Sequence, residues 1–209
     1  MRHLGLVLGL CLVATATHAW ASMISFVQAN INGQNGISGL GKGYRLALSP
    51  DGKHVYAATQ GDHALVTFTR DAVNGKLTQI DEIQDGVDGA TGLGTPEGVE
   101  VSSDGKNVYV ADDGIDAISV YARDPATGLL TYRSRQMHGV GGVGGLYGVG
   151  GLILSPDGKF VYGTDANRIS TFARDAATGD MTFVDELSAN SYSGIGFGNG
   201  TSMVIPPDG

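Results

Sequence analysis

The chain has 209 residues, a net charge of −8 at neutral pH and 34 glycines that show no collagen period. Its acidic surface would repel phosphate backbones, which argues against a nucleic-acid partner. Abundant glycine with few charged residues indicates many tight turns between short strands. The one cysteine is Cys11, near the N-terminus, so the remaining chain has neither a disulfide nor a thiol available for chemistry.

Residues 1–21 have the three-part pattern of a secretory signal peptide. Arg2 supplies the basic start, an apolar run extends from Leu4 to about Ala16, and Ala19-Trp20-Ala21 resembles a cleavage site. The run is shorter than the roughly 20 residues that a membrane span needs, although a retained N-terminal anchor is the alternative. We expect a periplasmic or extracellular protein without a membrane span after cleavage.

Three copies of one repeat follow the leader. LALSPDGKHVY begins at residue 46, and its counterparts VEVSSDGKNVY and LILSPDGKFVY begin at residues 99 and 152, a spacing of 53 residues each time. A second motif keeps step, as FTRDAVNGKLT, YARDPATGLLT and FARDAATGDMT, although the third copy is two residues shorter between the two motifs. A fixed period of this length predicts a repeat architecture.

Each copy contains four runs in which apolar residues alternate with a period of two, the pattern of β-strands. In the first copy these runs are residues 43–48, 54–59, 64–70 and 76–83. Pro50-Asp51-Gly52 and Asn74-Gly75 supply turn residues between them.

Four antiparallel strands in a repeat of this length predict one blade of a β-propeller. The predicted fold class is therefore all-β, with an incomplete ring, and the alternative is an extended β-solenoid or sandwich array. The expected blades are residues 40–83, 93–136 and 146–188.

Both ends of the repeat region align with parts of a further blade. Residues 23–30 align with the outer strand of the first copy, and residues 197–209 align with an inner strand and its first turn. Three full blades are fewer than the four to eight of a closed propeller. We therefore expect a fragment of a longer propeller, in which further blades are missing; a dimer that completes the ring is the alternative.

The repeated motifs SPDGKHVYAAT, SSDGKNVYVAD and SPDGKFVYGTD, each followed by an F-x-R-D type hairpin, resemble bacterial YVTN-type propellers. They resemble most the seven-bladed lactonase-family propellers, over nearly all of residues 23–209. Some members of that family are lactonases that act on a phosphorylated sugar lactone, while many exported members have no demonstrated chemistry. The resemblance supplies no catalytic position that matches residue by residue.

The strand order predicts which loops share a rim of the propeller. The loops between second and third strands and the links between blades lie on one rim, at the mouth of the central channel, where loops on a rigid scaffold carry function. The polar candidates for ligand contact on this rim are Asp62, His63, Asp85, Asp88, Glu97, Asp112, Asp113, Asp116, His138, Asp165 and Arg168.

Each candidate also has a structural interpretation. Aspartate beside glycine is commonly a turn residue, and a single loop histidine is commonly only solvated. The acidic loop DDGID lacks the ligand spacing of an EF-hand, so we expect no metal.

Two glycine-rich stretches resemble nucleotide-binding motifs, but we expect no cofactor. GISGLGKG (36–43) lacks the Ser or Thr that holds magnesium, and GVGGVG (139–144) precedes no helix. The chain contains no G-x-S-x-G elbow either.

The first functional hypothesis is a scaffold that binds an unidentified protein or small molecule through the channel-side loops. The alternative is a lactone hydrolase, which depends on the family resemblance alone. In a hydrolase, Glu97 or His63 would activate water. Glu97 precedes an inner strand and is the better placed of the two.

Overall fold

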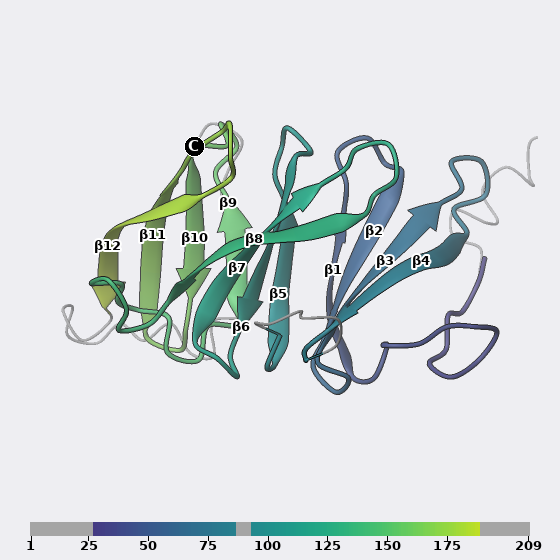
Figure 1. The fold of residues 1–209 in the computed structure, drawn as a ribbon, viewed down its shortest axis with the longest axis horizontal. Helices are drawn as coiled ribbons and strands as arrows, with labels where there is room; N and C mark the ends of the chain where they lie inside the picture. Colours follow the sequence, from purple (N-terminus) through teal and green to yellow (C-terminus); the bar gives the residue numbers. More distant parts are fainter. Residues whose placement is uncertain (1–26, 87–92, 189–209) are drawn as a thin grey trace, which may run out of the picture.

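The computed structural model describes residues 27–86 and 93–188, and these residues form twelve β-strands and no helix (Figure 1). The all-β prediction with four-stranded antiparallel blades is confirmed. The expected leader 1–21, the expected start of a fourth blade at 197–209 and the candidate Asp88 lie outside the described residues.

Each repeat forms one antiparallel sheet in which strands that follow one another along the chain are hydrogen-bonded neighbours. The first blade contains β1 (Gly43–Leu48), β2 (His54–Thr59), β3 (Ala64–Arg70) and β4 (Leu77–Gln84). The second contains β5 (Pro96–Val101), β6 (Asn107–Asp112), β7 (Ala117–Arg123) and β8 (Leu130–Met137). The third contains β9 (Gly151–Leu154), β10 (Phe160–Thr164), β11 (Arg168–Arg174) and β12 (Met181–Ser188).

The turn between the first two strands explains why each blade starts as a tight hairpin. Gly52, Gly105 and Gly158 have φ values of +69°, +71° and +70°, a region that glycine adopts without steric cost. In the first blade, Asp51 Oδ1 accepts hydrogen bonds from the Ser49 hydroxyl at 2.5 Å and from the backbone N–H of Lys53 at 3.1 Å. The other two turns contain the same pair of bonds.

Among the described residues, two of the three apolar clusters lie between blades, and the other joins Val55, Val66 and Phe68 of the first blade with Ile37 and Leu40 of the preceding segment. Tyr56 and Leu65 of the first blade share one buried cluster with Val99 and Val108 of the second. A second cluster joins the second and third blades through residues such as Tyr109, Ile118, Leu146, Val161 and Phe172. The inner strands β1, β5 and β9 are neighbours. Each blade therefore depends on its neighbour to cover a face of its sheet, as propeller repeats do.

A buried arginine at the end of the third strand joins the second blade to the first. Arg123 donates from Nε to the Tyr56 hydroxyl at 2.8 Å, from Nη2 to Asp51 Oδ2 at 3.0 Å, and from Nη1 to the carbonyl oxygen of Gly105 at 2.9 Å. The Tyr56 hydroxyl donates in turn to the carbonyl oxygen of Gly128 at 2.9 Å. We call this set the first arginine clasp.

The second arginine clasp repeats these bonds between the second and third blades. Arg174 donates to the Tyr109 hydroxyl at 2.7 Å, to Asp104 Oδ2 at 2.9 Å and to the carbonyl oxygen of Gly158 at 3.2 Å. The Tyr109 hydroxyl donates to the carbonyl oxygen of Gly179 at 2.8 Å. Because charged hydrogen bonds at a buried interface are strong and directional, the clasps fix how successive blades meet.

The two clasps differ at one position. In the first, Arg123 Nη2 lies 2.8 Å from His54 Nδ1, and in the second, Arg174 Nη2 donates to Asn107 Oδ1 at 2.8 Å. Burial, and then the positive charge of Arg123, lower the pKa of His54. The neutral ring can thus accept this bond, as the asparagine oxygen does.

The predicted outer strand 23–30 is absent from its described part, since residues 27–30 form no strand. A strand needs backbone hydrogen bonds to a neighbouring strand, and residues 27–30 do not form such bonds with the outer strand β4. The Gln28 side chain, rather than its backbone, bonds to β4: Nε2 donates to the Leu77 carbonyl oxygen at 3.1 Å, and the Leu77 N–H donates to Oε1 at 3.0 Å.

The meander order of the strands defines two rims. The hairpin rim carries the loops between first and second strands and between third and fourth strands, and it contains both arginine clasps. The linker rim carries the loops between second and third strands and the connections between blades. The polar candidates that the structure describes belong to the linker rim.

Candidate functional site

Glu97 lies at the start of the inner strand β5, at the junction of the first and second blades. Its carboxylate is half-buried, and Oε1 accepts a hydrogen bond from Gln60 Nε2 of the first blade at 2.8 Å. Gly150, beside the third blade, leaves room for this side chain, because a Cβ there would lie 2.6 Å from Glu97 Oε2. Gln60 of the first blade thus holds the carboxylate of the second, and Gly150 beside the third leaves it room.

The surroundings of Glu97 raise its pKa above the ordinary value for a glutamate. Burial is the largest cause and the nearby charge of Asp113 adds to it, whereas hydrogen bonds from Gln60 and Tyr44 and the charge of Lys42 act in the opposite direction. We call these five residues the Glu97 cluster. A carboxylate with a raised pKa is a stronger base and suits general acid–base catalysis near neutral pH.

The repeat provides an internal comparison for this cluster. Tyr44, Glu97 and Gly150 occupy the same position of the three copies, 53 residues apart. A blade does not require a carboxylate at this position, since the three residues differ completely. The Glu97 cluster is therefore a specialised feature of the junction between the first two blades.

His63 and Asp116 share another repeat position and brace the linkers between blades. Both have positive φ, at 52° and 53°, which is uncommon for residues other than glycine. His63 Nδ1 contacts the carbonyl oxygen of Gly94, and Asp116 Oδ1 accepts a hydrogen bond from the Gly148 N–H at 2.7 Å. Each side chain thus bonds the backbone of the following linker, which gives His63 a structural role.

Asp62 and Asp85 also bind backbone groups of the linkers. Asp62 Oδ2 accepts hydrogen bonds from the Gly41 N–H at 2.6 Å and from Asn32 Nδ2 at 3.0 Å. Asp85 Oδ1 accepts one from the Leu93 N–H at 3.3 Å. These contacts favour the structural interpretation of both aspartates.

Asp112 is fully buried at the end of β6, away from solvent. Its Oδ1 accepts hydrogen bonds from the backbone N–H groups of Thr95 at 2.7 Å and Ile115 at 3.2 Å, while Oδ2 has no hydrogen-bond partner in the described part of the chain. Burial outweighs these bonds and raises the pKa of Asp112 to about 6. A buried oxygen without a partner carries a desolvation cost.

The remaining candidates are dispersed along the linker rim. Asp113 is exposed and belongs to the Glu97 cluster. His138 stacks edge-on against Tyr147, with ring centroids 6.1 Å apart. Asp165 is buried and pairs with Arg168 at 3.9 Å, within the third blade. Across residues 27–86 and 93–188, no hydrogen bond or ion pair connects His138, Asp165 or Arg168 with Glu97.

Sequence reasoning missed three members of the cluster, namely Lys42, Tyr44 and Gln60. They lie at the start of an inner strand and in the adjacent loop, and nothing in their local motif distinguishes them. The signal that could have identified Tyr44 is its repeat position, which it shares with Glu97.

Among residues 27–86 and 93–188, no group of three or more His, Cys, Asp and Glu side chains is arranged to hold a metal ion. The same residues include no helix of the length and apolarity that a membrane span requires.

Residues 21–144 match the family described as "Lactonase, 7-bladed beta-propeller", which is more than half of the chain. A curated relative from Arthroderma benhamiae, named "Probable 6-phosphogluconolactonase", is 32% identical over 107 residues. This match covers 48% of the chain but only 24% of the relative. The chain thus spans about a quarter of that protein's length.

Solved structures share the fold. A "putative 6-phosphogluconolactonase" from Bacteroides uniformis is similar with a TM-score of 0.60 and 24% identity, over 73% of this chain and 42% of that one. The periplasmic gluconolactonase PpgL of Pseudomonas aeruginosa is similar with a TM-score of 0.58 and 24% identity, over 72% and 41%. At this identity the likeness establishes the propeller architecture and leaves the chemistry open.

Proposed function

Since the chain belongs to the seven-bladed β-propeller lactonase family, we propose that the protein hydrolyses a sugar lactone at the Glu97 cluster. The observation that carries this proposal is the half-buried Glu97 carboxylate, which has a raised pKa and is held by Gln60 at 2.8 Å. The relative's name, which refers to a lactonase, favours the hydrolase alternative over the binding scaffold.

The proposed reaction is the opening of the lactone ring by water. Glu97 takes a proton from a water molecule, whose oxygen attacks the carbonyl carbon of the lactone. The bond between this carbon and the ring oxygen then breaks, and the ring oxygen receives a proton. The product is the open-chain hydroxy acid, so one water is consumed for each lactone.

Neighbouring side chains have supporting roles in this proposal. Gln60 orients the Glu97 carboxylate through its hydrogen bond. Lys42, whose charge acts on Glu97, would stabilise the negative charge that develops on the carbonyl oxygen. Tyr44, whose hydroxyl acts on the Glu97 carboxylate, would return a proton to the ring oxygen.

The charges of the cluster favour a lactone without a phosphate group. The cluster contains two acidic side chains, Glu97 and Asp113, and a single lysine. A phosphate would be repelled by these carboxylates and would have only Lys42 as a counter-charge within the cluster. Export from the cytosol, expected from residues 1–21, is consistent with an unphosphorylated substrate.

The test is acid release from a panel of lactones, including gluconolactone and its 6-phosphate, corrected for spontaneous hydrolysis. We expect gluconolactone to be the better substrate, and Glu97→Gln to lower kcat/KM by roughly 10²–10⁴-fold, the usual contribution of a general base. Glu100→Gln is the matched control. It lies on the same strand and its pKa is also raised by burial, but it is outside the cluster, so kcat/KM should change little.

Two outcomes would overturn the proposal. Absence of acid release from every lactone would remove the hydrolase and leave the binding scaffold. Equal losses in the Glu97→Gln and Glu100→Gln variants would reject Glu97 as the specific base.

A further inference from the structure

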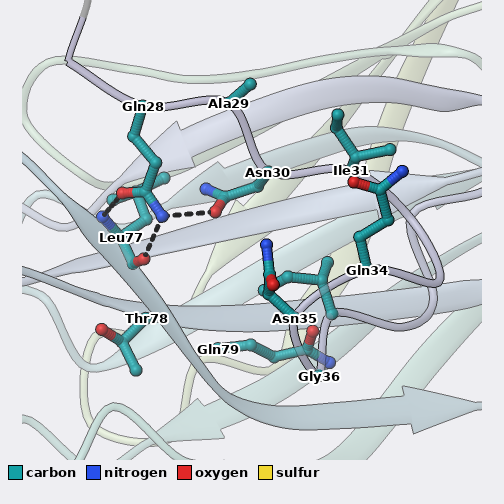
Figure 2. Close-up of a pocket in the computed structure, with 11 residues that line it drawn as sticks. Gln28, Ala29, Asn30, Ile31, Gln34, Asn35, Gly36, Leu77, Thr78 and Gln79 are labelled. Atoms are coloured by element: carbon teal, nitrogen blue, oxygen red, sulfur yellow. Dashed lines mark hydrogen bonds between the residues drawn. The ribbon is translucent and has the colours of Figure 1, made fainter.

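A polar pocket lies at the outer edge of the first blade, away from the Glu97 cluster. It has a volume of about 260 Å³ and is formed by the segment before β1 and the first residues of β4. Five side-chain carboxamides line it, from Gln28, Asn30, Gln34, Asn35 and Gln79 (Figure 2). We propose that this carboxamide pocket binds a neutral sugar of about one ring.

The concentration of carboxamides here is unusual for this chain. Three of its six glutamines line the pocket, and no Asp, Glu, Lys or Arg does so, although the chain is strongly acidic. A carboxamide presents an acceptor oxygen beside a donor NH₂ group. This combination suits hydroxyl groups, which donate and accept at once, and it favours a neutral ligand over an ion.

The segment that forms the pocket is held in place. The Gln28 carboxamide bonds both the N–H and the carbonyl oxygen of Leu77, and its Nε2 also donates to Asn30 Oδ1 at 2.7 Å (Figure 2). At the other end, the Ser38 N–H donates to Gln79 Oε1 at 3.0 Å. Bonds at both ends preform the pocket, which lowers the entropy cost of binding.

Several polar groups of the pocket remain available to a ligand. Asn30 Nδ2, the carboxamides of Gln34 and Asn35 and the hydroxyl of Thr78 have no hydrogen-bond partner among residues 27–86 and 93–188. Ile31, which is 50% exposed, adds an apolar surface. A sugar ring has both hydroxyl groups and C–H faces, which match these two kinds of surface.

The repeat shows that the turn does not require these carboxamides. In the segment before β1, the Gly33 N–H donates to the Ile37 carbonyl oxygen at 2.8 Å, and in the segment before β9 the Gly139 N–H donates to the Val143 carbonyl oxygen at 2.8 Å. These two turns have the same backbone bonds, yet Gln34-Asn35 in the first corresponds to Val140-Gly141 in the second.

Asn35 and its counterpart Gly141 share one backbone conformation. Asn35 has a φ of 52° and Gly141 a φ of 61°, a region that glycine adopts freely and that asparagine adopts more readily than most other residues. The turn therefore accepts either residue at this position, and Asn35→Gly should preserve its backbone.

The geometry disfavours a peptide as the ligand. A peptide that added a strand to β4 would need the backbone groups of Leu77, and the Gln28 side chain already bonds both of them. The volume also lies below the roughly 300–1,000 Å³ of pockets for drug-sized molecules. Both features favour a small ligand with many hydroxyl groups.

The test is a titration of the full chain with D-glucose, D-galactose, D-mannose and D-gluconate, followed by the NMR signals of the ¹⁵N-labelled carboxamides. We expect at least one neutral hexose to bind saturably, in the millimolar range, and to shift the signals of Asn30, Gln34 and Asn35. Gluconate should bind more weakly, since nothing in the pocket carries a compensating charge. No lactone is present, so the result does not depend on the proposed hydrolysis.

The combined variant Gln34→Val with Asn35→Gly copies the turn before β9 and should fold normally. It should weaken hexose binding by at least about tenfold, with an unchanged melting temperature. Asn167→Gly is the control, because it removes an exposed carboxamide from a third-blade loop. The proposal is overturned if no hexose binds saturably, if gluconate binds as well as the hexoses, or if the combined variant binds as tightly as the natural chain.

Discussion

On the hairpin rim, Arg123 and Arg174 make the same bonds in successive junctions, whereas on the linker rim Tyr44, Glu97 and Gly150 occupy one repeat position with three unrelated side chains. The first rim repeats its residues because each junction must bind its neighbour in the same way. The linker rim can vary, because the strands that its loops connect are already held by the blades. Repetition thus marks assembly of the propeller. A position that departs from the repeat, such as Glu97, is a candidate for function when its side chain does not brace a linker as His63 and Asp116 do.

The strongest way to test this contrast is to remove a clasp. Arg123→Ala should lower the free energy of unfolding by about 3 kcal/mol, because the Tyr56 hydroxyl and the Asp51 carboxylate lose the guanidinium group that they bind. The lower end of the usual range applies because the Asp51 side chain is 32% exposed. Denaturant unfolding of the full chain measures the change.

Arg70→Ala is the matched control for this measurement. Arg70 ends β3 as Arg123 ends β7. It donates a hydrogen bond to the Gly52 carbonyl oxygen of its own blade at 3.2 Å. Its loss should cost less than about 1 kcal/mol. Equal costs for the two variants would contradict the role of the clasp between blades.

On the linker rim, Asp112 should limit stability in a pH-dependent way. Its folded pKa of about 6 exceeds the unfolded value of about 3.9, so the folded state holds the proton more tightly. The contribution of Asp112 to stability therefore falls as the pH rises from about 4 to about 6, and the cost remains above that range. Asp112→Asn should stabilise the protein by about 3 kcal/mol at pH 7 and change little below about pH 4.

Thermal or denaturant unfolding at a series of pH values provides this comparison. Asp165→Asn, at the same repeat position, is the control. Its carboxylate pairs with Arg168 at 3.9 Å, so its removal should not stabilise the protein. A stability profile of Asp112→Asn that is parallel to that of the natural chain between pH 4 and 6 would refute the assignment.

Gly150 tests whether the position of the Glu97 carboxylate matters for activity. A Cβ at Gly150 would lie 2.6 Å from Glu97 Oε2, so Gly150→Ala should displace the carboxylate and lower kcat/KM by roughly tenfold. Gly43→Ala is the control, because a Cβ there meets nothing within 4 Å. Lactone hydrolysis and the melting temperature are the measurements. An unchanged kcat/KM in the Gly150→Ala variant would contradict the requirement for this position of the carboxylate.

The smallest effect is expected from giving the first arginine clasp the acceptor residue of the second. His54→Asn gives the first clasp the acceptor of the second, and both side chains pack against an equivalent glycine, Gly128 or Gly179. Stability should change by less than about 1 kcal/mol. A larger loss, measured by denaturant unfolding, would mean that the two junctions are less alike than their bonds indicate.

The strands were predictable because the turn residues that separate them have strong local preferences. Pro50-Asp51-Gly52 and its counterparts place the first hairpins, and the predicted strand 76–83 differs by one residue from β4. The clasps were not predicted, since Asp51 and Arg123 lie 72 residues apart. The signal that would have revealed them is joint repetition: Asp51 and Tyr56 recur after 53 residues, and Arg123 recurs after 51, because the third copy is two residues shorter.

The candidate site was predictable only in part. Glu97 could be chosen because it precedes an inner strand. Most acidic candidates, such as Asp62 and Asp116, instead bind linker N–H groups, and a sequence does not distinguish a carboxylate that braces a loop from one that faces solvent. The carboxamide pocket was not predicted, because it arises where the segment 27–37 meets β4.

The arginine clasps also determine how this array should unfold. Each clasp couples only adjacent blades, so the folding free energy is a sum of blade and junction contributions, as in a one-dimensional nearest-neighbour system. A blade that shares its core with a neighbour is less stable alone, and strong junctions then make neighbouring blades melt together. Each junction combines an apolar cluster with one arginine clasp, so weakening either arginine should divide a single transition into two.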